Sequence, residues 1–299
     1  MIKVDETFDI TYIDPSSFSE FNRCPAKYMF NRLMGLTPHE SSRVALDYGT
    51  VIHMAIPHCY DNPKQALITF RAEWAKYPHG EEDVKRNCAR AAASITDFYE
   101  KHQVSPYEIL SLNIEAPTHD EISKNEIPFL IDIGGPLAFA GRMDAVVKWR
   151  ADESLWALDY KTASEVSARY FKSFHNAPAT VGYALAAQQL LGLKVDGLII
   201  EAIRTTKANP ANDLELVFVQ KHQIESFILQ VNNKAKEILF CNDNRTWFKQ
   251  CSGCACYTMF GTVGYSCPFM DICNSPDWQD AAQYYNRVEP FHPFRVSKG

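Results

Sequence analysis

Two strand-like segments joined by a short turn constrain the fold of this chain more than any other feature. Residues 137–149 and 154–161 are rich in Leu, Val and Trp, and the turn signal Ala151-Asp152-Glu153 lies between them. We expect the two segments to pair as a β-hairpin. The same criteria predict further strands at 107–116, 127–133, 195–204 and 213–220.

Helical segments precede and follow these strands. Ser17, with Glu20 three positions later, forms a capping-box pattern that predicts a short helix. Pro25 fits the first position of a second helix, which extends to about Leu33. Longer helices are predicted at 43–57, 63–76, 81–103, 178–191 and 222–240. This order predicts an α/β protein with a mixed central sheet flanked by helices, in which the two ends of the chain meet.

Length and composition narrow the class of protein. We expect a single domain over residues 1–299, with a mainly helical part at 1–105, a core at 106–241 and a Cys-rich tail at 242–299. The chain has no run of 18 apolar residues and no apolar signal core at its N-terminus, so we expect no membrane contact and a cytoplasmic location. The net charge of −6 argues against a protein that coats nucleic acid non-specifically.

Two carboxylates and a lysine are expected to converge on the hairpin. Asp159 and Lys161 are two residues apart on a strand, so their side chains point to the same face. Asp144 lies on the preceding strand, where pairing brings it beside Asp159. Hard divalent cations prefer such oxygen ligands, and the backbone carbonyl of Tyr160 is a further candidate ligand. The alternative is that Asp159 and Lys161 form an ordinary surface ion pair.

The sequence around these three residues resembles the PD-(D/E)xK nuclease superfamily, specifically its RecB-like branch with an iron–sulfur cluster. That branch includes CRISPR adaptation exonucleases, AddB-type nuclease domains and phage exonucleases. The resemblance extends from Ser17 to Cys273, and Asp144, Asp159 and Lys161 match the two acids and the lysine of the family. It implies a restriction-endonuclease-like fold.

The resemblance also implies a function. The expected activity is that of an exonuclease dependent on Mg²⁺ or Mn²⁺, which acts on single-stranded DNA or DNA ends and leaves a 5′-phosphate and a 3′-hydroxyl. The expected context is recombination, repair or phage replication, with a recombination or replication protein as a further partner. A second hypothesis is a non-catalytic DNA-binding or assembly subunit that keeps the fold, and the intact set of Asp144, Asp159 and Lys161 argues against it.

Three further residues are candidates by the same resemblance. His53 ends the pattern Gly49-x-x-x-His53 on a predicted helix and would be a metal ligand, with Gly49 allowing close approach of the helix to the sheet. The alternative for His53 is a hydrogen-bonded helix histidine. Glu115 corresponds to a glutamate on the first core strand of relatives, or is an exposed strand-end carboxylate. Tyr183 matches the tyrosine of a Q-x-x-x-Y element, in which Ala179 replaces the glutamine.

The cysteines point to a second metal centre. Six of nine fall between Cys241 and Cys273, and in a reducing compartment such clustering favours metal ligation over disulfides. The resemblance implies a 4Fe–4S cluster, which needs four thiolates. The expected ligands are Cys24, Cys256, Cys267 and Cys273, with Cys254 or Cys251 as alternatives to Cys256. A zinc site at Cys251, Cys254, Cys267 and Cys273, in a zinc-stapled module of unrelated activity, is the competing interpretation.

Cationic side chains around the first of these cysteines are candidate phosphate contacts. Arg23, Lys27 and Arg32 have a spacing that suits one helix face. Aromatic rings such as Tyr28, Phe30 and Tyr170 are candidates for stacking on unpaired bases. The alternatives are a solvated helix face for the cations and a place in the core for the rings.

Overall fold

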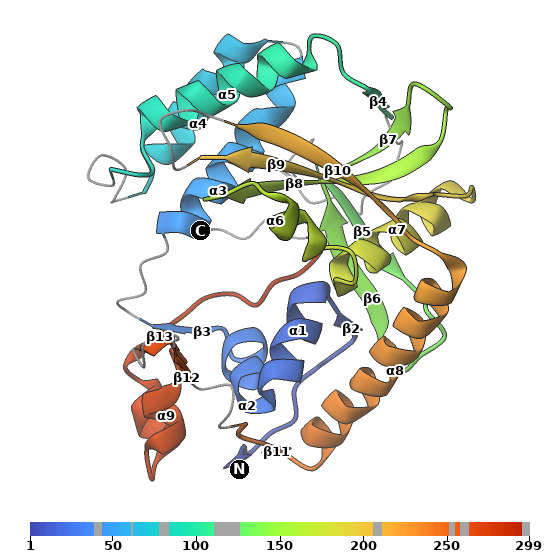
Figure 1. The fold of residues 1–299 in the computed structure, drawn as a ribbon. Coiled ribbons are helices and arrows are strands. Elements are labelled where there is room, and N and C mark those ends of the chain that lie inside the picture. Colours follow the sequence, from blue (N-terminus) through green and yellow to red (C-terminus); the bar gives the residue numbers. More distant parts are fainter. Residues whose placement is uncertain are drawn as a thin grey trace. The chain divides into compact units, whose positions relative to one another are not determined.

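The fold was obtained as a computed structural model (Figure 1). It describes residues 1–38, 44–60, 62–77, 84–110, 126–205, 211–250, 255–257 and 263–294, and for 255–257 and 263–266 only the backbone. The chain divides into two compact units. The first unit comprises Met1–Ser41, Leu130–Gly141 and Glu225–Gly299, and the second comprises Ser42–Phe129 and Arg142–Ile224.

A five-stranded mixed sheet forms the centre of the second unit. Its strand order is β10-β9-β8-β7-β4, in which β8 and β9 are parallel and the other neighbours are antiparallel. The strands are β4 (Tyr107–Ile109), β7 (Ala145–Trp149), β8 (Leu155–Ala163), β9 (Gly197–Arg204) and β10 (Asn212–Phe218). The expected mixed sheet is confirmed, and so is the hairpin, since β7 pairs with β8.

Helices cover the sheet of the second unit (Figure 1). One face packs on α3 (Val44–Ala55), the 3₁₀ turn η2 (Ile56–Tyr60), α4 (Pro63–Trp74) and α5 (Cys88–His102). Alternate residues of β8, namely Trp156, Leu158 and Tyr160, point into that core, as the period-two geometry of a strand requires. After β8 the chain forms α6 (Ala168–Lys172), which the sequence did not predict, and then α7 (Pro178–Leu191), which contacts β8 and β9.

One predicted strand is in fact two. The segment 137–149 divides into β6 (Ala138–Met143) and β7, with a bend at Asp144. β6 belongs to a separate three-stranded sheet with β2 (Tyr12–Ile13) and β5 (Ile127–Ile131). Strand-forming residues lie on both sides of Asp144, and no Gly or Pro turn signal separates them there, so the sequence pattern did not reveal the bend. The predicted strand 107–116 is described as β4 at its start, and its remainder from 111 lies outside the described residues.

The first unit joins the two ends of the chain. Antiparallel pairs connect β1 (Ile2–Lys3) with β11 (Thr246–Trp247), and β3 (Leu36–Pro38) with β14 (Tyr285–Arg287). Its helices are α1 (Pro15–Arg23), α2 (Pro25–Tyr28) continued by the π-helical η1 (Met29–Leu33), most of α8 (Lys221–Asp243), α9 (Met270–Asn274) and α10 (Trp278–Ala282). The expected irregular tail therefore contains short helices and strands, including β12 (Ala255–Tyr257) and β13 (Val263–Ser266).

The predicted capping box at Ser17 is wrong. Asp14 is the N-cap of α1, because its carboxylate accepts hydrogen bonds from the backbone N–H of Ser16 and Ser17. Pro15 occupies the first helical position, where its missing N–H costs nothing. The helix therefore begins two residues before the predicted cap, and Glu20 is left to bind other partners.

Within the described ranges, no helix combines the length and the apolar character needed to cross a membrane.

Candidate active site

The bend at Asp144 creates the site. The last residue pair of the β7–β8 ladder toward this end is Ala145 with Leu158. Beyond this pair, the Asp144 side chain replaces the backbone partner that a neighbouring strand would supply. Its Oδ2 accepts a hydrogen bond from the backbone N–H of Tyr160 at 2.5 Å. Among the described strands, β8 from Asp159 onward is paired only with β9. One edge of β8 therefore has no strand neighbour among the described residues at the positions of Asp159 and Lys161.

Asp159 and Lys161 are in direct contact, which confirms that they share one face of β8. The Lys161 Nζ lies 2.7 Å from Asp159 Oδ1 and 2.5 Å from Oδ2. The Asp159 side chain is 6% exposed and that of Lys161 is 34% exposed, so this is no ordinary surface pair. Oδ2 is buried and has the lysine nearby, but it has no partner at hydrogen-bonding angles. This oxygen remains available to another donor or to a cation.

His53 approaches the same carboxylates from α3. Its Nδ1 lies 3.6 Å from Asp144 Oδ1. Gly49 makes this approach possible: a Cβ at Gly49 would lie 2.9 Å from Thr162 Oγ1 on β8, closer than real Cβ atoms come. The predicted role of Gly49 in close helix–sheet packing is therefore confirmed.

The two carboxylates experience opposite electrostatic surroundings. Burial tends to raise the pKa of Asp144, but the charge and hydrogen bond of His53, the charge of Lys161 and the N–H of Tyr160 outweigh it and lower that pKa. For Asp159, burial is also the largest effect, and together with the charge of Asp144 it raises the pKa despite the nearby Lys161. Asp144 is thus held firmly ionised, whereas Asp159 is the carboxyl group that gains most from a further positive charge.

The acidic neighbours raise the pKa of both basic groups. Burial opposes protonation of Lys161, but the charges of Asp159 and Asp144 raise its pKa above the ordinary value. Burial likewise opposes protonation of His53, and Asp144 outweighs it, so that this pKa is also raised. A cation bound between the carboxylates would compete with both groups for the same negative charge.

The donor set of the site fits a hard divalent cation. Two carboxylates and the carbonyl of Tyr160 are oxygen ligands, and Mg²⁺ commonly binds through one or two carboxylates while keeping several waters. Across the described part of the chain, no group of three or more His, Cys, Asp or Glu side chains is arranged so that it could hold a metal ion without rearrangement. The observation that favours a cation here is the buried Asp159 carboxylate, whose Oδ2 faces the Lys161 ammonium at 2.5 Å but makes no hydrogen bond at normal angles.

The remaining candidates are placed differently. Tyr183 lies on α7 with its ring edge-on to Phe129, at 5.8 Å between centroids. Glu115 lies outside the described residues. Tyr170, on α6, lies close enough to Lys161 for the two groups to affect each other's pKa, and burial and Asp159 raise the pKa of Tyr170. Because the sequence pattern predicts no helix at 168–172, it contains no signal that would bring Tyr170 to this lysine.

Three of the four predicted cluster cysteines are buried in the first unit, although no three of the described side chains form a group that could hold a metal ion as they stand. Cys24 is the N-cap of α2, Cys267 lies shortly before α9, and Cys273 lies within α9. Burial and the negative charge of Cys24 both raise the pKa of Cys267, and Cys267 and Cys273 both act on Tyr285. Only the backbone of Cys256 is described, on β12 opposite Tyr265 of β13, directly before Cys267. Cys251 and Cys254 lie outside the described residues.

The candidate phosphate contacts of the first unit have protein partners. Glu20 accepts hydrogen bonds from Asn31 and pairs with Lys27 at 3.4 Å and with Arg32 at 2.9 Å. Lys27 also lowers the pKa of the Cys267 thiol, against the larger effect of burial. These cations therefore neutralise a half-buried carboxylate beside the cysteines.

A mixed sheet that presents two acidic groups and a lysine where two strands separate defines a nuclease-type core. Residues 13–274 match the family model of the PD-(D/E)XK nuclease superfamily, and the chain belongs to this superfamily. The crystal structure of a candidate exonuclease from Eubacterium rectale is similar in fold, with a TM-score of 0.50 and 13% sequence identity over 81% of this chain and 85% of that one. No curated protein sequence matches the chain.

Proposed function

We propose that this chain is a metal-dependent deoxyribonuclease that hydrolyses phosphodiester bonds as an exonuclease. The observation that carries the proposal is the convergence of Asp144, Asp159 and Lys161 at the point where the β7–β8 ladder ends. Membership of the nuclease superfamily supports it. A catalytic use explains why the Asp159 carboxylate is kept buried beside Asp144, although both effects raise its pKa.

Each residue of the site has a role in this proposal. Asp144, Asp159 and the Tyr160 carbonyl would hold Mg²⁺ or Mn²⁺, with His53 as a further ligand. The ion would polarise the scissile phosphate and lower the pKa of a bound water. Lys161 keeps its proton, because Asp159 and Asp144 raise its pKa. Its ammonium group is therefore suited to orient the attacking water and to offset charge on the phosphate oxygens, and not to act as a general base.

The proposed substrate is single-stranded DNA or a DNA end. The superfamily assignment supports a nucleic-acid substrate, and the exonuclease name of the structural relative supports attack at an end. The choice of single-stranded DNA rests on the resemblance of the sequence to DNA exonucleases. With a net charge of −6, the chain must bind a polyanion through local cations and bound metal, not through its overall field. Recombination, repair or phage replication is the proposed context, with a replication or recombination protein as partner.

A 4Fe–4S cluster is the second part of the proposal. Cys24, Cys267 and Cys273 supply three buried thiols from the two ends of the chain, and β12 carries Cys256 as the proposed fourth ligand. Thiolates are buried favourably only with a compensating positive centre, which a cluster provides. Its role here would be structural, because it joins α2 to α9 within the first unit.

Lys161→Ala, compared with Lys148→Ala, tests the enzyme assignment. Lys148 lies on the adjacent strand β7 and pairs with Glu153 at 2.8 Å, outside the site. We expect Lys161→Ala to lose Mg²⁺-dependent degradation of end-labelled single-stranded DNA by about 100-fold or more, because a preorganised charge at the phosphate is removed. Lys148→Ala should keep full activity. Full activity in Lys161→Ala would remove the proposed site.

A further inference from the structure

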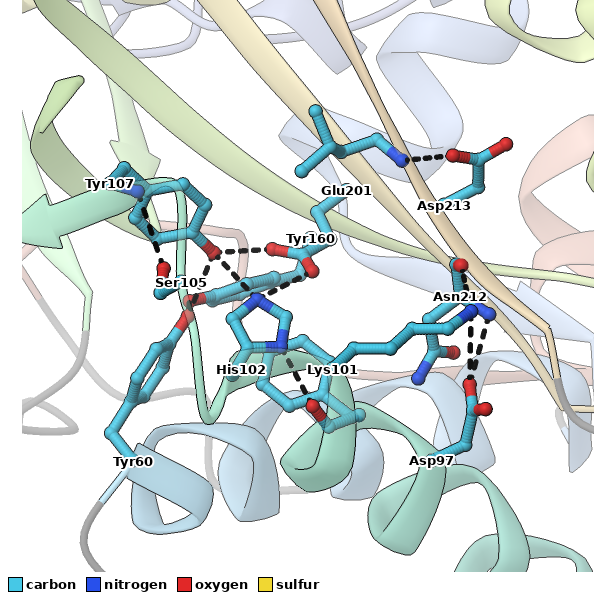
Figure 2. A network of polar contacts seen from close by, with 12 residues as sticks. Tyr60, Asp97, Lys101, His102, Ser105, Tyr107, Tyr160, Glu201, Asn212 and Asp213 are labelled. Carbon is cyan, nitrogen blue, oxygen red and sulfur yellow. Dashed lines mark hydrogen bonds and ion pairs between the residues drawn. The ribbon is translucent and has the colours of Figure 1, made fainter. Parts of the chain in front are cut away.

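A buried polar network, drawn in Figure 2, lies on the face of the second-unit sheet that carries the Tyr160 side chain. Asp159 and Lys161 point to the opposite face, because side chains alternate along β8. It consists of Tyr60 on η2, His102 on α5, Tyr107 on β4, Tyr160 on β8 and Glu201 on β9. The Tyr60 hydroxyl lies 2.5 Å from the Tyr160 hydroxyl and 2.9 Å from that of Tyr107. Tyr107 donates to Glu201 at 2.5 Å, and His102 Nε2 lies 2.8 Å from the other oxygen of Glu201.

Stability alone does not account for this network. Glu201 is 2% exposed and lies in the interior of the sheet, among residues that are otherwise apolar. A buried ion pair is often no more stabilising than apolar side chains of similar size, because both charges lose their hydration. A chain under selection for stability alone would therefore fill this position with an aliphatic residue. The network ends on Tyr160, which links it to the site.

Tyr160 is the residue through which the network reaches the site. It lies between Asp159 and Lys161 in the chain and is the register partner of Glu201 in the parallel β8–β9 pair. Its N–H is bound by Asp144 and its carbonyl is a proposed metal ligand, whereas its hydroxyl is bound by Tyr60 on the opposite face. This residue is therefore held from three directions.

Support of this kind is needed because of the local topology. From Asp159 onward, β8 has lost its β7 neighbour and is paired only with β9 among the described strands. A strand with one neighbour twists and shifts more easily than a central strand. The side chains of Asp159 and Lys161 follow any such movement, and displacements of about 1 Å cost large factors in rate.

We propose that Tyr60, Tyr107, Glu201 and His102 are positioning residues for the nuclease reaction. They anchor the Tyr160 side chain and so fix Asp159, Lys161 and the Tyr160 carbonyl on the half-supported end of β8. The inference rests on the proposed function. Tyr60 is the critical member, because its hydroxyl is the contact that joins Tyr160 to the rest of the network.

Tyr60→Phe, compared with Tyr48→Phe, tests the proposal. Tyr48 is a buried tyrosine of the same apolar cluster whose hydroxyl donates to the Asn87 carbonyl, so both variants lose one hydroxyl from one core. We expect Tyr60→Phe to lower kcat on single-stranded DNA by about 10- to 100-fold, the range for residues that orient metal ligands, with KM little changed. Tyr48→Phe should leave kcat at the wild-type value.

Two readouts do not depend on activity. In Tyr60→Phe, Mn²⁺ should bind more weakly by electron paramagnetic resonance, and backbone amides of 159–163 should exchange with deuterium faster, while Tyr48→Phe changes neither. Equal effects of the two variants, or wild-type Mn²⁺ affinity and exchange in Tyr60→Phe, would overturn the proposal. If the wild-type chain does not cut DNA, the proposed function fails, and these two readouts still decide whether the network positions β8.

Tyr160→Phe provides an independent variant if Tyr60→Phe folds poorly. It removes the other end of the same hydrogen bond and should lower kcat by a similar factor. The double variant should lose no more than either single variant, because both remove one interaction. Losses that multiply in the double variant would show that the two hydroxyls act separately, contrary to the proposal.

Discussion

At the scale of single residues, Asp144 and Asp159 have the same side chain but opposite surroundings. His53, Lys161 and the Tyr160 N–H stabilise the ionised form of Asp144 and lower its pKa against burial. Burial and the nearby Asp144 charge destabilise the ionised form of Asp159 and raise its pKa. In the absence of metal, the ionised form of Asp144 is therefore favoured more strongly by its surroundings than the ionised form of Asp159.

Asp144→Asn is expected to lower the stability more than Asp159→Asn. At neutral pH with EDTA, Asp159→Asn should lower the thermal midpoint only a little, because the repulsion of Asp144 that it relieves offsets part of the lost pairing with Lys161. Asp144→Asn should lower it more, because a favourably placed carboxylate is lost. Differential scanning fluorimetry measures both, and each variant should lose DNA hydrolysis. Equal shifts of the midpoint would contradict the opposite pKa shifts.

The His102–Glu201 pair provides a pH test. Burial lowers the pKa of His102, but the hydrogen bond and charge of Glu201 outweigh it and raise that pKa above 6.5. A histidine with a raised folded-state pKa stabilises the fold fully below the unfolded value, and this stabilisation is lost as the pH rises through the folded-state value. The stability lost in His102→Asn should therefore be largest at about pH 6 and should shrink toward about pH 9.

Urea unfolding of wild type and His102→Asn at several pH values checks this expectation. His175→Asn is the matched control, because His175 pairs with Glu215 at 3.2 Å in a position where both side chains are well exposed. Its effect on stability should be small at every pH, since exposed pairs contribute little. A stability difference for His102→Asn that does not vary with pH would show that the buried pair is not ionised.

At the scale of elements, the contact between α3 and β8 decides the geometry of the site. Gly→Ala in a helix normally stabilises by about 0.5–1 kcal/mol. At Gly49 the sign should reverse, because the new Cβ would lie 2.9 Å from Thr162 Oγ1. We expect Gly49→Ala to destabilise the fold by about 1–3 kcal/mol, as overpacking does, and to lower activity as His53 moves from Asp144.

A second substitution separates overpacking from other causes. Thr162→Ala removes the hydroxyl that the new methyl group would meet, so Gly49→Ala/Thr162→Ala should recover most of the stability lost in Gly49→Ala. Denaturant unfolding of the two single variants and the double variant gives the coupling energy. Strictly additive effects would show that the close approach at Gly49 does not constrain α3.

The parts of the fold that were predictable follow local rules. Period-two alternation placed Asp159 and Lys161 on one face, and the turn signal at 151–153 paired β7 with β8. The bend at Asp144 was not predictable, because it depends on a side chain accepting the Tyr160 N–H from another strand. The N-cap of α1 was predicted wrongly because Ser17 matches the capping-box sequence pattern. In the structure, the carboxylate of Asp14 accepts the backbone N–H groups at the start of the helix, and Pro15 is the first helical residue.

The buried network was beyond sequence reasoning for a different reason. Tyr60 and Tyr160 are 100 residues apart in the chain, and Tyr107 and Glu201 are 94 apart. None of these residues stands out in the sequence by its type or its neighbours. They come together only when the sheet folds. Long-range polar contacts of this kind have no periodic signature, unlike the apolar faces of helices and strands.

At the scale of the whole molecule, the cysteines of the first unit predict a visible property. Anaerobically purified protein should be brown with broad absorbance near about 400 nm, as expected for four thiolates around iron and sulfide. Cys267→Ser should lose the colour and lower the thermal midpoint, because the link between the chain ends is removed. Cys88→Ser, at a half-buried thiol of the second unit, should keep both. Colourless wild-type protein with one equivalent of zinc would contradict the cluster.

The central claim is that Asp144, Asp159 and Lys161 form one hydrolytic metal site. A crystal structure of the chain soaked in Mn²⁺, with anomalous differences measured, tests it most directly. We expect one strong peak within about 2.0–2.5 Å of carboxylate oxygens of both Asp144 and Asp159 and of the Tyr160 carbonyl. A manganese peak elsewhere, or well-ordered carboxylates that bind no ion at saturating Mn²⁺, would contradict the assignment of this chain as a metal-dependent nuclease.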